Sequence, residues 1–203
     1  MGVLRRVFGP SKGEIWRQLS DEMGAHFVEG TWRKPERVEV SHGEWTVTLD
    51  TYAVSTGKVT VVYTRLRAPF VNPEGFRFNV YRRTAFSGIG KWLGMQDVEI
   101  GDQEFDDRFI VQASDESRVR QLLGHPKLRE LLMRQPDVHF SVKDNEGWFG
   151  TKYPENVDLL SFVVVGVIRD PERLKAIFEL FAETLHELCR MGSAYEGDPG
   201  VRV

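Results

Sequence analysis

Arginine and tyrosine side chains share one face of each of two stretches that predict strands. Side chains two positions apart point to the same side of a strand, so each stretch presents these groups together. They are Tyr63, Arg65 and Arg67 in the first stretch, and Arg77, Tyr81 and Arg83 in the second. If the two strands are neighbours, one surface combines cations with aromatic rings, as in sheets that bind anions or single-stranded nucleic acid. The alternative is a polar face that only keeps an antiparallel sheet soluble.

A second candidate site is the glycine-rich loop AFSGIGKWLGM, residues 85–95. Its large apolar side chains include Phe86, Ile89, Trp92 and Leu93. If they are exposed, they form a patch for protein interaction. The alternative is that they cover an open end of the sheet.

The residue types that usually carry catalysis or bind metals are scattered. The histidines, which show no spacing typical of a zinc site, are His26, His42, His125, His139 and His186. The single cysteine cannot form an intramolecular disulfide, and no serine lies in a Gly-x-Ser-x-Gly elbow. We therefore predict no metal, no cofactor and no catalytic residue. An enzyme with a dispersed pocket, built from a histidine and carboxylates, is an alternative.

Charge is distributed unevenly along the chain. Residues 97–116 carry eight acidic side chains against Arg108 alone, a local charge of −7, whereas residues 58–91 carry seven basic side chains against Glu74, or +6. These segments either pair across the sheet or lie on separate solvated faces. The net charge of the whole chain is −3, so attraction to nucleic acid or an anionic membrane requires a local patch.

One strand-to-helix junction occurs twice. Asp115 and Asp170 each follow an apolar stretch and begin a helical pattern, DESRVRQLL in one copy and DPERLKAIF in the other. An aspartate at this position accepts hydrogen bonds from the free amides of the first helical turn, so we predict that both are structural helix caps. The repetition suggests two similar halves, residues 11–123 and 125–191, that share one core; the alternative is convergence of two capped helices.

Apolar periodicity predicts the elements that position these residues. Spacing of three and four favours further helices over residues 11–24, 125–135 and 170–191. Alternation or apolar runs favour strands over 38–52, 58–66, 76–83, 104–113 and 159–168. This mixture predicts an α+β fold in which helices pack on one face of a largely antiparallel sheet. We treat residues 1–203 as a single domain whose end, 192–203, is a flexible tail.

The run from Glu104 to Leu132 resembles a bacterial family of uncharacterised proteins. The shared pattern is F-D-x-x-F-x-V, an aspartate, R-x-L-L, a proline and an apolar helix. The matching residues are Phe105, Asp106, Phe109, Val111, Asp115, Arg120, Leu122, Leu123 and Pro126. The match covers under a fifth of the chain. The family has no assigned activity, so the resemblance implies no catalytic residue. Its members often carry membrane-spanning helices, which this sequence does not predict.

These observations favour a non-enzymatic binding or protein-interaction module, with a protein partner or a second copy of the chain as its partner. The dispersed enzyme is the second hypothesis, and a binder of nucleic acid or another polyanion through the Arg/Tyr face is the third. The start of the chain has no apolar run typical of a signal peptide, and the longest apolar run, at residues 159–168, is about half of what a membrane span requires. We therefore expect a soluble, cytoplasmic protein without a membrane span.

Overall fold

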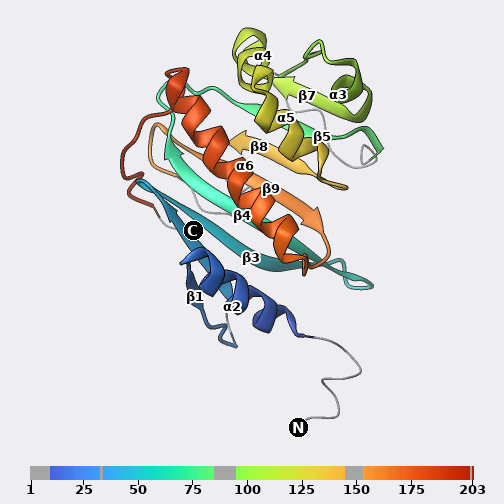
Figure 1. Cartoon of the computed structure of the whole chain (residues 1–203), viewed down its shortest axis with the longest axis vertical. Coiled ribbons are helices and arrows are strands. Elements are labelled where there is room, and N and C mark those ends of the chain that lie inside the picture. Colours follow the sequence, from blue (N-terminus) through green and yellow to red (C-terminus); the bar gives the residue numbers. More distant parts are fainter. Residues whose placement is uncertain (1–9, 33, 85–94, 145–152, 202) are drawn as a thin grey trace.

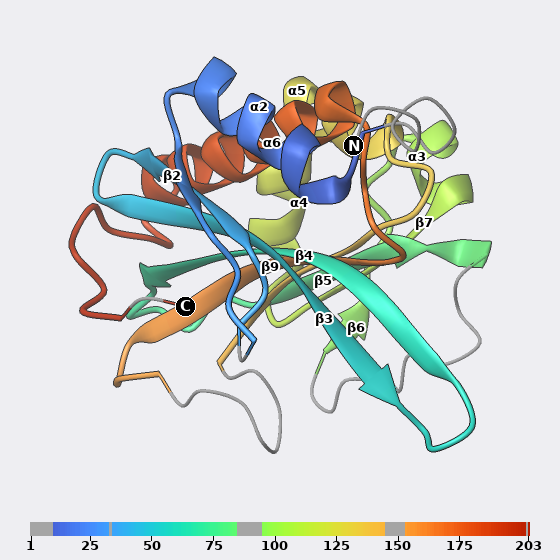
Figure 2. The same ribbon diagram turned by 90° about the horizontal axis from the view of Figure 1, so that it is seen from below.

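A computed structural model describes residues 10–32, 34–84, 95–144, 153–201 and 203. The described strands form one nine-stranded sheet (Figure 1). Helices α2, α5 and α6 lie above one face of this sheet when the molecule is seen along its edge (Figure 2). The predicted α+β fold with a largely antiparallel sheet is therefore confirmed.

The elements have the following bounds. The helices are α2 (Lys12–Met23), α3 (Gln103–Arg108), α4 (Glu116–Gly124), α5 (Pro126–Met133) and α6 (Pro171–Arg190). The strands are β1 (His26–Val28), β2 (Arg37–His42), β3 (Trp45–Ser55), β4 (Thr60–Val71), β5 (Phe78–Arg82), β6 (Gln96–Asp97), β7 (Phe109–Ala113), β8 (His139–Lys143) and β9 (Val157–Val165).

The order of the strands separates the two predicted Arg/Tyr stretches. The order is β1-β2-β3-β4-β9-β8-β5-β7-β6, and every neighbouring pair is antiparallel. The premise that β4 and β5 are neighbours is wrong, because the later strands β8 and β9 insert between them as a pair. Phe162 of β9 and Phe140 of β8 lie in register between Leu66 of β4 and Val80 of β5, so the core continues across the insertion.

Local sequence chemistry defines the ends of the two helices that flank the β2–β4 region. Ser11 and Glu14 form a capping box at the start of α2, and Gly24 ends that helix in the left-handed conformation. Helix α6 starts at Asp170, whose side chain accepts from backbone amides, with Pro171 at the first helical position. Both helices therefore begin where the sequence predicted.

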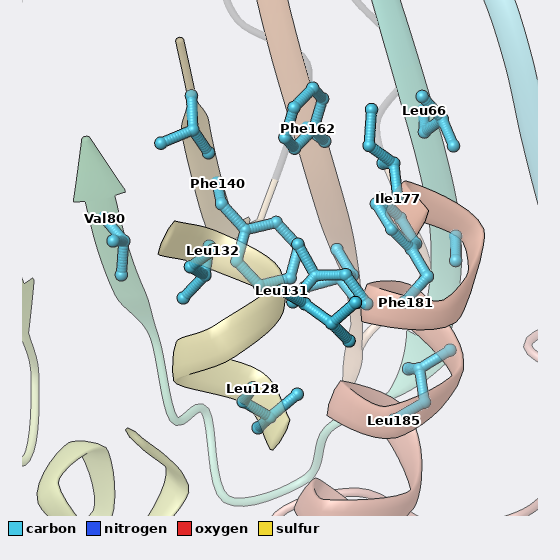
Figure 3. Close-up of a cluster of buried hydrophobic side chains, with 14 of the residues drawn as sticks. Leu66, Val80, Leu128, Leu131, Leu132, Phe140, Phe162, Ile177, Phe181 and Leu185 are labelled. Carbon is cyan, nitrogen blue, oxygen red and sulfur yellow. The ribbon is translucent and has the colours of Figure 1, made fainter. Parts of the chain in front are cut away.

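The core lies between one face of the sheet and the helices. Figure 3 shows side chains of β4, β5, β8 and β9 packed against those of α5 and α6. The labelled members are Leu66, Val80, Leu128, Leu131, Leu132, Phe140, Phe162, Ile177, Phe181 and Leu185. Each fully buried leucine or phenylalanine contributes roughly 2 kcal/mol of transfer free energy. This face of the sheet is fully committed to the fold, so a binding site must be sought on the other face.

One predicted strand begins too early. Residues Gln103–Arg108 form helix α3, and only Phe109–Ala113 form the strand β7. The side chain of Asp102 accepts from the amide of Phe105 and caps α3, and an ion pair from Glu104 to Arg108 spans one turn. Local capping and pairing therefore override the alternation that favoured a longer strand.

Strand β5 does not expose the polar face that an Arg/Tyr binding surface would require. Asn79 and Tyr81 are 0% and 1% exposed. Strand β5 is paired on both sides, with β8 and with β7, so it lies inside the sheet. The predicted binding residue Tyr81 is therefore not accessible on this face.

The segment predicted as a flexible tail begins as packed structure. Ser193 and Ala194 are buried, and the amide of Tyr195 donates to the carbonyl of Val71 at 3.1 Å. This contact corrects the prediction for residues 193–195, because a backbone hydrogen bond ties them to the end of β4.

The proposed duplication stays a prediction. Asp115 precedes α4 directly after β7, whereas Asp170 precedes α6 after a connection that follows β9. Residues 145–152 of the second predicted half lie outside the described residues.

Candidate functional site

The face of the sheet opposite the helices carries an unbroken row of polar side chains. The strand registers align one residue from each of the nine strands. In spatial order these are His26, Glu39, Thr48, Arg67, Ser161, Ser141, Asn79, Gln112 and Asp97. The predicted binding residue Arg67 is part of this polar row.

The middle of the polar row is buried and its two ends are accessible. The six central residues, Thr48 to Gln112 in spatial order, are at most 5% exposed. Near one end, Gln112 Nε2 donates to Asp97 Oδ1 at 2.9 Å. Glu39, next to one end of the row, lines one cavity, and Asp97, at the other end, lines another. Among the described residues, the open face therefore offers separate cavities rather than one continuous binding surface, and the two larger ones lie toward opposite ends of the polar row.

The first cavity, which we call the basic pocket, has a volume of about 800 Å³ and lies over β2, β3 and β4. Its charged lining side chains are Lys34, Arg37, Arg65 and Arg67, opposed by Glu39 and Asp50. Four cations against two carboxylates give these side chains a net charge of +2. Two of the predicted binding residues, Arg65 and Arg67, thus line one cavity, and its charged side chains have the net positive charge that an anion-binding site requires.

Asp50 organises the two arginines of the basic pocket. Its carboxylate accepts from Arg65 at 2.6 and 3.0 Å, through Nε and Nη2, and from Arg67 Nη2 at 2.8 Å. The register explains the meeting, because Asp50 lies opposite Arg65 in the β3–β4 hairpin. The forked contact holds the guanidinium plane of Arg65 in one orientation, and the Arg65 side chain is still 25% exposed.

Aromatic and aliphatic groups form a wall of the basic pocket. The guanidinium carbon of Arg65 lies 4.9 Å from the centre of the Tyr52 ring, and that ring stacks on Tyr63 at 5.0 Å. Burial raises the pKa of Tyr52, which therefore stays protonated near neutral pH. Ala53 and Val62 add apolar surface. The predicted residue Tyr63 thus supports the site through Tyr52.

The fold is similar to that of a solved structure. Neither a protein-family model nor a curated protein sequence matches the chain. The crystal structure of the mycobacterial trehalose monomycolate transport factor A, TtfA, is similar with a TM-score of 0.52 and 8% sequence identity. The similarity covers 87% of this chain and 94% of that one. At this identity the likeness shows the fold alone. Among the described residues of this chain, we find no helix with the length and apolar character of a membrane span.

The second cavity, which we call the acidic pocket, has a volume of about 690 Å³ and lies beside β6, β7 and α4. Its charged lining side chains are Asp97, Glu99, Asp106 and Glu116, opposed by Arg83 and Arg120. The predicted residue Arg83 therefore lies in a cavity of net negative charge. Its Nη2 donates to the backbone carbonyls of Asp106 and Phe109 at 2.8 and 3.4 Å.

The other two predicted binding residues lie between the pockets and line neither of them. Arg77 forms ion pairs with Asp158 at 3.3 Å and with Asp144 at 3.1 Å. Tyr81 is buried and meets the ring of His139 edge-on at 6.4 Å. The structure therefore brings Arg65, Arg67 and Tyr63 together and leaves Arg77, Tyr81 and Arg83 elsewhere.

The two predicted caps lie at helix starts and line neither the basic nor the acidic pocket. Asp115 Oδ1 accepts from the amide of Arg118 at 2.9 Å. Asp170 Oδ1 accepts from the amides of Glu172 and Arg173 at 3.0 and 3.3 Å. The candidate interaction loop with Phe86, Ile89, Trp92 and Leu93 lies outside the described residues.

Two of the five histidines form a close pair, and a third, His139, is half-buried. His42 Nε2 and His186 Nε2 lie 3.0 Å apart, and burial together with the nearby His186 lowers the pKa of His42. Burial, with a contribution from Lys143, lowers the pKa of His139 to about 4. Within the described ranges, no three potential metal ligands lie together.

Sequence reasoning missed Asp50, Tyr52, Lys34 and Arg37. A signal for Asp50 existed: a two-residue turn at Gly57 and Lys58 places Asp50 opposite Arg65 by simple counting along the hairpin. No comparable signal exists for Lys34 and Arg37, because the path of the chain before β2 depends on its packing against α2.

Proposed function

We propose that this chain is a non-enzymatic binding module whose ligand site is the basic pocket and whose ligand is anionic. The observation that carries the proposal is the convergence of four cationic side chains on one cavity of about 800 Å³ that also has an aromatic and aliphatic wall. Such a lining suits a ligand with negative charges next to apolar groups.

Three of the four cations of this pocket are held in place before any ligand arrives. Asp50 fixes Arg65 and Arg67, and Glu39 accepts from Arg37 Nε at 2.6 Å. Side chains that are already ordered lose less entropy on binding, so the same contacts give a higher affinity. These ordered side chains distinguish the pocket from a surface patch of lysines whose side chains are free to move.

Two features favour binding over catalysis. No histidine is among the described lining residues of the basic or the acidic pocket, so the dispersed enzyme lacks its proposed base in either cavity. The structural neighbour is by its title a transport factor, a role that involves binding. The resemblance of residues 104–132 to an uncharacterised bacterial family is compatible with this proposal.

A polyanion-binding Arg/Tyr face is the second candidate, now confined to β4. Because Arg77 and Arg83 lie outside the basic pocket, a long basic stripe across the sheet is not available to a nucleic acid strand. We therefore expect short anionic groups, rather than an extended phosphate backbone, to be the better ligands.

Titration with polyglutamate, followed by calorimetry at low salt, tests the proposal. We expect the double variant Arg37→Ala/Arg65→Ala to weaken binding by about tenfold or more, because it removes two charge-assisted contacts. Arg83→Ala and the surface change Arg134→Ala serve as matched controls and should change affinity by less than about twofold. Equal losses in all variants, or no binding by the parent protein, would contradict the proposal.

A further inference from the structure

Strand β3 extends beyond its partner β2. The pairing of β2 with β3 ends at Val38 and Leu49, whereas the pairing of β3 with β4 continues to Ser55 and Thr60. The β3–β4 hairpin accordingly reaches past the rest of the sheet (Figure 2). Among the described strands, residues 50–55 of β3 thus have a partner strand on one side only.

The chain before β2 turns away from this edge. Glu36 pairs with Lys12 of helix α2 at 3.3 Å, on the side of the helices. Pro35 has no amide hydrogen to donate to a ladder with β3. Strand β2 therefore begins only at Arg37, which leaves space beside β3. This space forms part of the basic pocket, and Lys34 and Pro35 line its other side.

The free edge of β3 presents backbone donors and acceptors. The amide of Thr56 donates to the carbonyl of Val59 at the hairpin turn, which fixes the alternation of hydrogen-bonded pairs along β3 and β4. Even-numbered residues of β3 therefore bond to β4, and Thr51, Ala53 and Ser55 direct their backbone groups to the free edge. Within the described residues, no hydrogen bond to these edge-facing backbone groups is formed.

This edge lacks the protection that exposed strands usually carry. The stretch from Thr51 to Thr56 reads TYAVST, without a charge or a proline, and Ala53, Val54 and Ser55 are exposed. Natural proteins normally block such an edge with lysine, proline or a bulge. An unblocked, uncharged edge of high strand propensity favours pairing with another extended segment.

We infer that the basic pocket binds an extended acidic segment of another protein, which pairs with the free edge of β3 as an added strand. The inference rests on the proposed function and names its partner class. Every second side chain of the added strand would face the pocket, where carboxylates would meet Arg37 and Arg65. A second copy of this chain fits less well, because it would bring an identical basic pocket to the same edge.

A fluorescein-labelled peptide in which glutamate and valine alternate tests strand addition by fluorescence polarisation. Two further peptides carry N-methyl groups on one or the other set of alternate amides. We expect one methylated peptide to bind about tenfold more weakly or worse, because its donors to β3 are lost, and the other to bind within about threefold of the parent. The matching lysine–valine peptide should not bind.

The variant Ala53→Pro examines the same edge from the protein side. It removes an edge-facing donor without breaking the ladder to β4, so its affinity for the peptide should fall about tenfold. If this variant unfolds at a much lower temperature than the parent protein, the methylated peptides still test strand addition with the unmodified protein.

The outcomes separate the two proposals. Equal affinity of both methylated peptides, with polyglutamate binding that depends on Arg37 and Arg65, would overturn strand addition and leave the anion site standing. Failure of both polyglutamate and the acidic peptide to bind would overturn both proposals. Concentration-dependent dimerisation that Ala53→Pro abolishes, without peptide binding, would assign the edge to a second copy and overturn the acidic partner.

Discussion

The basic and acidic pockets lie toward opposite ends of one polar row and carry opposite charges. The basic pocket combines four cationic side chains with two carboxylates, and the acidic pocket combines four carboxylates with two arginines. The predicted Arg/Tyr residues divide between these regions, since Arg65 and Arg67 line the first and Arg83 lines the second. Arginines that the sequence grouped on one face thus occupy opposite electrostatic surroundings.

The two regions also use their carboxylates differently. In the basic pocket, Asp50 binds side-chain cations that face the cavity. In the acidic pocket, the carboxylate of Asp106 accepts from the amides of Ile100 and Gly101 at 2.9 and 2.8 Å, which shapes the loop before α3. The comparison teaches that a charged cluster indicates a binding site only where its charges face a shared cavity instead of satisfying the backbone.

The largest expected effect separates Asp50 from Asp106. Because Asp50→Ala leaves two guanidinium groups, one of them buried, without their shared carboxylate, it should lower the free energy of unfolding by about 3–5 kcal/mol. Asp106→Ala removes an acceptor for two amides near the surface and should cost about 1–2 kcal/mol. Urea denaturation of both variants measures the difference, and equal losses would remove the distinction between the two regions.

The half-buried His139 of β8 tests the region between the pockets. Its pKa is lowered to about 4 in the folded protein, whereas an unfolded histidine titrates near 6.5. The unfolded chain therefore binds the proton first, and stability should fall as pH decreases from about 6.5 to about 4. When the pH is lowered from about 7.5 to about 5, the free energy of unfolding of His139→Gln should fall by roughly 2 kcal/mol less than that of the parent protein.

Denaturant titrations at both pH values provide the measurement for His139. The histidine pair of His42 and His186 is present in both proteins, so its contribution cancels in the comparison. An identical pH dependence for the parent and His139→Gln would show that His139 is protonated as readily in the fold as in the unfolded chain.

The smallest effects concern the two capping aspartates, which lie outside both pockets. Asp115→Ala and Asp170→Ala should each cost on the order of 1 kcal/mol, because the first-turn amides lose their acceptor, and asparagine at either position should cost less. Thermal melts report the loss, and polyglutamate binding should persist in every variant. An Asp170→Ala protein as stable as its parent would count against the capping argument.

The elements were predictable from the sequence where local chemistry is strong. Ser11, Gly24 and Pro171 mark helix ends through backbone rules that operate within a few residues. The strand order was not predictable, because the insertion of β8 and β9 between β4 and β5 depends on contacts between residues far apart in the chain. Alternation alone does not identify a strand's neighbours.

Part of the candidate site was predictable because it depends on one strand alone. Tyr63, Arg65 and Arg67 lie on one strand, so the period of two suffices to group them. The contribution of Lys34 and Arg37 depends on where β2 leaves β3, a property of tertiary packing. The burial of Tyr81 is a property of the folded molecule that alternation within residues 76–83 does not predict.

Amide chemical-shift mapping during titration with polyglutamate tests the central claim most directly. The basic pocket predicts shift changes concentrated at residues 50–53 and 62–67, which line or flank the cavity, that weaken as salt is raised. Residues 97–111, beside the acidic pocket, should remain unchanged. Shift changes centred on residues 97–111, or spread evenly over the molecule, would contradict the assignment of the basic pocket as the binding site.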